Sequence, residues 1–104
     1  DVAEVTLSAS GVPAAPGQPT LVNIGVGQIQ VAWSLVADAQ FYNIYQQVVG
    51  TDLDFVFVSP AMMGPSTLSS LPPGETVRVR LTAANANGES NPGPHAEIII
   101  AEGA

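Results

Sequence analysis

The stretches WSLVADAQFYNIY (residues 33–45) and LPPGETVRVRLTAANANGES (residues 71–90) decide how this chain folds. In the second stretch, Val77, Val79 and Leu81 alternate with polar residues from residue 77 to residue 83. In the first stretch, Tyr42 and Ile44 alternate in the same way. A side-chain period of two is that of a β-strand with one buried face and one face in water. We therefore predict strands at residues 41–46 and 77–83, with these five side chains pointing inward.

Five further short strands are expected on both sides of these two. Residues 28–33 alternate so that Ile29, Val31 and Trp33 share one face. Shorter apolar segments lie at residues 20–23, 55–58, 66–69 and 96–100, separated by Gly, Pro, Asn and Asp clusters. No window repeats apolar residues with a helical period while staying free of Gly and Pro. The pattern predicts an all-β fold, a seven-stranded antiparallel immunoglobulin-like sandwich.

Proline and glycine positions add detail to this fold. Pro13, Pro16 and Pro19 precede the first strand, and prolines suit an edge strand because they cannot donate a backbone hydrogen bond. Asn87 and Gly88 follow the strand at residues 77–83, and both residue types tolerate positive φ. We therefore expect a tight hairpin at residues 87 and 88.

The spacing of the key residues resembles a fibronectin type III module of the bacterial or phage type. The residues that carry the resemblance are Trp33, Tyr42, Ile44, Leu71, Pro73, Gly74, Val79, Ala83, Asn85, Gly88, Glu89 and Ser90. The resemblance implies a domain at residues 13–101, with residues 1–12 as a linker or the tail of a preceding module and residues 102–104 as a C-terminal linker. One position departs from the family pattern, because Val77 stands where such modules usually carry a tyrosine. An integrin-binding Arg-Gly-Asp tripeptide is also absent from the sequence.

Composition restricts the partners of the chain. Its 104 residues suit one domain, and 46% of them are hydrophobic while only 11% are charged, which favours a folded core over disorder. Nine acidic residues against two arginines, with no lysine, give a formal net charge of −7. Such a surface repels nucleic acid and anionic membranes, since both bind to clustered basic residues. Cysteine is absent, which excludes disulfides and thiolate metal sites.

The first residues echo the last predicted strand. AEVTL at residues 3–7 resembles AEIII at residues 96–100, at an offset of 93 residues, about one module. One hypothesis is that residues 1–10 descend from the last strand of a preceding module and that the domain belongs to a tandem array. The alternative is a chance match between two β-prone pentapeptides.

Candidate chemistry is sparse. His95, Ser90 and Glu89 form at most a crude triad, because no oxyanion-hole turn or Gly-x-Ser-x-Gly elbow accompanies them. Asp52 and Asp54 offer too few carboxylates for a calcium site and suit a solvated turn. We therefore assign no catalytic residue, metal or cofactor and expect no enzymatic activity.

Two surfaces are candidates for ligand binding. Phe41 and Tyr45 point outward and, with Phe55 or Phe57, could form an apolar platform. The alternative is that the loop at residues 59–65, which contains Met62 and Met63, folds over this face and buries it. The loops at residues 34–40 and 86–94 are expected at one end of the sandwich. The second loop offers the polar side chains of Asn87, Glu89 and Ser90.

These observations predict a non-catalytic spacer or interaction module of a larger exported multidomain protein, such as a cell-surface protein, a secreted enzyme or a phage structural protein. The expected partners are neighbouring domains of the same chain, and the isolated module is expected to be monomeric. The expected location is extracellular, at the cell surface or on a virion, in a prokaryotic setting. The alternative is a dedicated binding module that recognises carbohydrate or protein, as in cell adhesion, through the outward aromatics or the polar loops.

Overall fold

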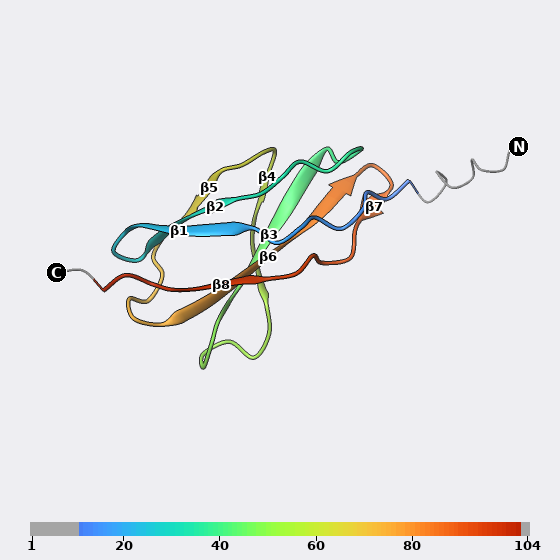
Figure 1. Cartoon of the computed structure of the whole chain (residues 1–104). Helices are drawn as coiled ribbons and strands as arrows, with labels where there is room; N and C mark the ends of the chain where they lie inside the picture. The colour runs from blue at the N-terminus through green and yellow to red at the C-terminus, as the bar shows by residue number, and fades with distance from the viewer. Residues whose placement is uncertain (1–10, 103–104) are drawn as a thin grey trace, which may run out of the picture.

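The computed structural model describes residues 11–102 as two antiparallel sheets packed face to face (Figure 1). The three-stranded sheet has the order β1-β2-β5, and the larger sheet has the order β4-β3-β6, with β7 and β8 both paired to β6. The strands are β1 (Thr20–Gly25), β2 (Gln28–Ala32), β3 (Phe41–Val48), β4 (Val56–Ala61), β5 (Ser66–Leu68), β6 (Thr76–Asn85), β7 (Gly88–Glu89) and β8 (Ala96–Ile99). The predicted all-β sandwich is confirmed.

Residues 11–102 contain no helix, and hence none long and apolar enough to cross a membrane.

Strands β3 and β6 form the centre of the larger sheet. They pair without interruption from Phe41 opposite Ala84 to Val48 opposite Val77. Ile44 and Leu81 lie opposite each other and are fully buried, as the alternation predicts. Alternate side chains of an antiparallel pair share one face, so the aliphatic side chains of both strands enter the same core. That core also takes side chains from the other sheet and the C-terminal end, and comprises Ile29, Val31, Val48, Leu68, Leu71, Val77, Val79 and Ile100 besides the pair above.

Trp33 borders this core rather than lying inside it. The indole is half-buried and meets the Tyr42 ring edge-on at 5.5 Å between centroids. Its Nε1 is buried and has no hydrogen-bond partner among the described residues. The resemblance implies a tryptophan buried between the sheets, and here the indole is only partly buried: it packs against the core at the end nearest the β2–β3 loop.

Two short strands, β7 and β8, follow β6 where the sequence predicts one. Both pair with β6, and residues 90–95 between them keep two backbone contacts to it, Ser90 N to Ala83 O at 2.7 Å and Gly93 N to Leu81 O at 2.9 Å. Pro92 and Pro94 have no N–H to donate, so a regular ladder cannot continue through this segment. The sequence prediction of a single strand at residues 96–100 missed β7.

The β6–β7 hairpin has Ala86 and Asn87 as its turn residues, since Asn85 pairs with Gly88. Of residues 87 and 88, only Gly88 has positive φ, 141°, so the expectation of positive φ at both is half right. Asn87 N donates to Asn85 Oδ1 at 2.8 Å, and an asparagine side chain that accepts from the backbone two residues on stabilises a turn. This contact shapes the hairpin without a left-handed residue in the turn.

Strand β4 is an edge of the larger sheet, because only β3 pairs with it. Its register with β3 shifts between Ile44 and Tyr45, which indicates a β-bulge. Pro60 lies in this strand opposite Asn43 and cannot donate to any further strand.

The segment before β1 packs along the larger sheet. Pro13, Pro16 and Pro19 are all buried, and Gln18 Nε2 donates to His95 O at 3.0 Å. A Cβ at Gly93 would lie 2.0 Å from Pro16 O, so this approach of two backbones requires glycine at residue 93. The chain is thus attached to the sandwich from residue 11 onward.

Candidate functional site

The outer face of the larger sheet carries a carboxylate with three donors. Glu89 Oε2 accepts hydrogen bonds from Tyr45 Oη at 2.6 Å, from Asn43 Nδ2 at 3.0 Å and from Thr82 Oγ1. The donors stand on β3 and β6, and Glu89 stands on β7, so one oxygen joins three strands. Hydrogen bonds to an ionised acceptor are stronger than neutral ones. We define Asn43, Tyr45, Thr82 and Glu89 as the Glu89 cluster.

The cluster shifts the pKa of two of its members in opposite directions. Hydrogen bonds from Thr82 and then from Tyr45 lower the pKa of Glu89, because they stabilise its ionised form. The pKa of Tyr45 is raised, first because its hydroxyl donates to Glu89 and also because burial disfavours the phenolate. Glu89 is therefore held as a carboxylate and Tyr45 as a neutral phenol, an arrangement that joins strands and leaves neither group as a base poised near neutral pH.

Beside the cluster, Arg80 and Phe55 cover part of the outer face. The Arg80 guanidinium lies 4.0 Å from the centroid of the Phe55 ring, within the range of a cation–π interaction. His95 approaches the same ring at 5.9 Å between centroids. Arg80 Nε is buried and has no hydrogen-bond partner within the described range. The alternation of residues 77–83 places Arg80 on the face in water, but its side chain is partly covered there, because the β3–β4 connection lays Phe55 over it.

The remaining outward aromatics stay accessible. Phe57 on β4 is 52% exposed and meets the Tyr45 ring at 5.7 Å, edge-on. Met62 and Met63 are 73% and 62% exposed. The alternative that residues 59–65 fold over this face and bury it is wrong. Residues 59–61 belong to the edge strand β4, and Met62 and Met63 after it are exposed to solvent.

Phe41 lies apart from that pair, at a shallow apolar hollow of about 390 Å³. Pro60, Ala61 and Met62 form the other walls. Phe41, Tyr45 and Phe55 therefore do not form one continuous platform, because each lies in a different place on this face. The most exposed ring is that of Phe57.

A second candidate surface lies at the end of the sandwich where the described chain begins, which we call the N-terminal pole (Figure 1). The β2–β3 loop and the β6–β7 hairpin meet there, as expected for residues 34–40 and 86–94. Together with the first described residues they form an open hollow of about 510 Å³. Its walls are Gly11, Val12, Asp38, Ala39, Gln40, Asn85, Ala86 and Asn87.

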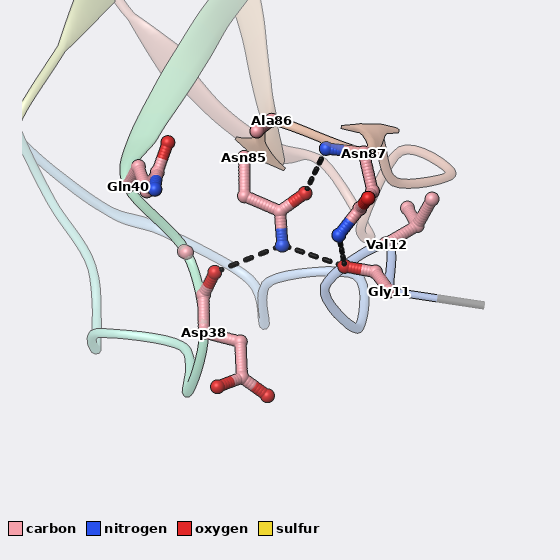
Figure 2. Close-up of a pocket in the computed structure, with 8 residues that line it drawn as sticks. Gly11, Val12, Asp38, Gln40, Asn85, Ala86 and Asn87 are labelled. Atoms are coloured by element: carbon pink, nitrogen blue, oxygen red, sulfur yellow. Dashed lines mark hydrogen bonds between the residues drawn. The ribbon is translucent and has the colours of Figure 1, made fainter. Parts of the chain in front are cut away.

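Asn85 joins the three segments that build this hollow (Figure 2). Its Nδ2 donates to Gly11 O at 2.6 Å and to Asp38 O at 3.1 Å, while its Oδ1 accepts from Asn87 N. Asn87 Nδ2 adds a second, longer contact of 3.3 Å to Gly11 O. The direction of the chain at residue 11 is therefore fixed by two amide side chains, and we call this arrangement the N-terminal clamp.

The opposite end, the C-terminal pole, fixes the chain in the same manner. Asn23 on β1 donates from Nδ2 to Ile99 O at 3.0 Å and accepts Ala101 N on Oδ1 at 3.0 Å. The turn before β6 adds Gly74 N to Ile100 O at 2.8 Å and Ile100 N to Glu75 O at 2.9 Å. These bonds form the C-terminal clamp, which joins the smaller sheet to the end of β8.

Three of the residues considered for catalysis or metal binding, Ser90, Asp52 and Asp54, are engaged in backbone contacts. Ser90 Oγ accepts from Ala83 N and donates to Asn91 O, each at 2.9 Å, and does not bond His95. Asp52 Oδ2 accepts from Val48 N at 2.9 Å, and Asp54 Oδ1 accepts from Phe55 N at 2.7 Å. Over residues 11–102, no three His, Cys, Asp or Glu side chains gather to hold a metal ion.

The six residues proposed from the sequence as a ligand surface thus occupy different places. Tyr45 and Glu89 meet in the Glu89 cluster, whereas Phe55 covers Arg80 and Asn87 belongs to the N-terminal clamp. Phe41 lines its own hollow, and Ser90 is buried. Sequence reasoning missed Asn43, Thr82 and Arg80 as members of a site, and it named Phe57 only as an alternative to Phe55. It named Asn85 for the resemblance but not as the residue that holds Gly11. Only Asn85 carried a signal, because it stands directly before the turn.

No family model matches the chain, and no curated protein matches it. Solved structures with the same fold do match. The fibronectin type III domain of human fibronectin type III domain containing protein 3 is 19% identical, with a TM-score of 0.75, over 86% of this chain and 87% of that one. The likeness extends over nearly a whole single module.

Two matches lie inside much longer chains. A crystal structure of titin domains is 21% identical with a TM-score of 0.79, covering 88% of this chain and 33% of that one. The twitchin kinase region from C. elegans is 21% identical with a TM-score of 0.74, and the match covers 86% of this chain and 17% of that one. The chain therefore spans a small part of these proteins. At these identities the comparison establishes the fold, that of a fibronectin type III module.

Proposed function

We propose that this chain, with its fibronectin type III fold, is a non-catalytic spacer module of a larger exported multidomain protein. The observation that carries the proposal is that the chain enters at one pole and leaves at the other, and that a clamp fixes it at each (Figure 1). A domain held in this way sets a constant distance and direction between its neighbours. Structures of the same fold in titin and twitchin stand in multidomain chains.

The surface of the chain supports this role. Its net charge of −7 favours solubility and a monomeric state, and it disfavours nucleic acid and anionic lipid as partners. The absence of cysteine and lysine accords with a prokaryotic extracellular setting, at the cell surface, in a secreted enzyme or on a virion. The partners are then the neighbouring domains of the same chain.

Titration separates this proposal from a binding role. The isolated chain is titrated with polysaccharides and with candidate protein partners while binding is followed by calorimetry. A spacer gives no saturable heat with any of them. Saturable binding at micromolar concentration, abolished by substitution of an outer-face aromatic, overturns the proposal.

The second candidate function is a binding module, and the accessible ring pair of Tyr45 and Phe57 favours it. Paired aromatic rings on a rigid sheet suit a sugar face or an apolar peptide side chain. Phe57→Ser should then abolish binding while the fold is kept, because half of the ring is already in water. The matched control is Val58→Ser on the same strand, at 38% exposure, which should leave binding intact.

A further inference from the structure

The starting observation is that both ends of the module are fixed by side chains rather than left free. The N-terminal clamp holds Gly11 O through Asn85 and Asn87, and the C-terminal clamp holds Ala101 N through Asn23. Gly11, the first described residue, therefore stands in the wall of the N-terminal hollow, at about 510 Å³ the larger of the two described above (Figure 2).

The structure gives a physical meaning to the sequence echo at the chain start. Along β8 and the residue after it, Ile98 packs on the core, Ile99 is exposed and Ile100 is fully buried. At the offset of 93, Val5 and Leu7 correspond to the two inward positions, and the polar Thr6 corresponds to the exposed one. Residues 1–10 lie outside the described residues, so this comparison concerns sequence alone. The two pentapeptides therefore agree in composition, and they also place apolar residues where Ile98 and Ile100 point inward and a polar residue where Ile99 points outward.

This correspondence gives an upper limit for the distance between two successive modules. Ser8 corresponds to Ala101, the last residue held by the C-terminal clamp, and Gly11 is the first residue held by the N-terminal clamp. Only three residue steps separate the two fixed points, and a fully extended chain covers about 10 Å in three steps. A separation of about 10 Å equals the spacing of two packed sheets, which leaves room for side chains only.

We infer that the N-terminal pole is a docking surface for the C-terminal pole of a module of the same fold that directly precedes it in the chain. This inference rests on the proposed spacer function, and it adds that the contact between the two modules is rigid. The β1–β2 turn of the preceding module enters the N-terminal hollow. In the present chain that turn presents Val26, which is 56% exposed, and Val12 and Ala86 in the hollow are exposed as well.

A tandem protein tests the joint. Residues 1–100 are followed directly by residues 8–104, so that Ile100 takes the place of Leu7 and Ser8–Ser10 forms the connection. Trp33→Phe in the first copy makes tryptophan fluorescence report the second copy alone. The control carries ten additional Gly and Ser residues before Ser8. We expect the second copy to melt about 4 °C or more above the control. Equal melting temperatures for the two proteins overturn the inference.

Variants locate the contact. Val26→Ser in the first copy should remove most of that shift, whereas Val22→Ser, at 47% exposure on the neighbouring strand β1, should leave it unchanged. Carboxylates lie at both poles, with Asp38 at one and Glu75 at the other, so added salt should enlarge the shift by screening their repulsion. Identical effects of the two serine variants overturn the assignment of the turn.

The outcomes separate this inference from the spacer function. If the tandem shows no shift and the single chain binds nothing, the spacer function stands and its joints are hinges. If the single chain binds a polysaccharide or peptide saturably, the spacer function itself fails, whatever the tandem shows.

Discussion

The two faces of the β3–β6 pair are stabilised by different kinds of interaction. On the inner face, Ile44 and Leu81 are fully buried, and their contribution follows from apolar area removed from water, which depends little on direction. On the outer face, Tyr45 and Thr82 direct their hydroxyls at a single oxygen of Glu89. The inner face tolerates any well-packed aliphatic set, whereas the outer face depends on particular atoms.

The largest loss in the free energy of unfolding should come from a substitution on the inner face. Leu81→Ala leaves a cavity among fully buried side chains and should lower the free energy of unfolding by about 2 to 5 kcal/mol. Urea denaturation followed by Trp33 fluorescence measures it. Thr82→Val is the matched control at the next residue, because it keeps the volume and removes only the hydroxyl that reaches Glu89. A loss for Thr82→Val as large as that for Leu81→Ala would contradict the comparison.

The outer face should show a smaller effect with strong coupling. Tyr45→Phe and Glu89→Gln each weaken the same hydrogen bond, and each should lower the free energy of unfolding by about 1 kcal/mol. Because both residues share that bond, the double variant should lose clearly less than the sum of the two single losses. Additive losses in the double-mutant cycle would show that the bond contributes nothing.

The pH dependence should be smaller still and should belong to the outer face alone. The folded-state pKa of Glu89 is lowered from its ordinary value of 4.5, so its contribution is complete above about pH 4.5 and is lost as pH falls through the folded pKa. Tyr45 has its pKa raised from 10.0, so its contribution is complete below pH 10.0 and is lost as pH rises through the folded pKa. The stability difference between the native chain and Glu89→Gln should therefore shrink from pH 7 to pH 3. A constant difference would contradict the shift.

The smallest effect should come from an ion pair outside the cluster. Arg78 Nε lies 3.0 Å from Glu97 Oε1, with side-chain exposures of 37% and 52%. Exposed pairs of this kind contribute little, so Glu97→Gln should change the free energy of unfolding by less than about 0.5 kcal/mol. Thermal unfolding at low salt is the sensitive measurement, since salt screens the pair. A change equal to that of Glu89→Gln would mean that charge alone, without converging donors, explains the outer face.

The inner face could be predicted from the sequence because it follows a period. Val77, Val79 and Leu81 alternate without exception, and all three are fully buried. The short strand β7 was missed because two residues, Gly88 and Glu89, cannot display a period. Strand β7 is recognised only from its pairing with β6, which the sequence of residues 88 and 89 does not indicate.

The candidate sites could be predicted less completely because they depend on register. Tyr45 and Glu89 are 44 positions apart, and nothing in the composition of either segment indicates that β6 brings them together. The N-terminal clamp likewise joins Asn85 to Gly11 across 74 positions. The aromatic surface was partly predicted, since alternation places Tyr45 outward, but the position of Phe55 over Arg80 is set by a connection without regular structure.

Pro60 has a consequence for arrays of such modules. Copies joined along one chain bring their β4 edges to a high local concentration, and unpaired edges of identical sequence tend to pair across modules during folding. A proline in that edge withholds one donor from any intruding strand. In an array of identical modules, this missing donor would make exchange of β4 strands between neighbouring copies less favourable during folding.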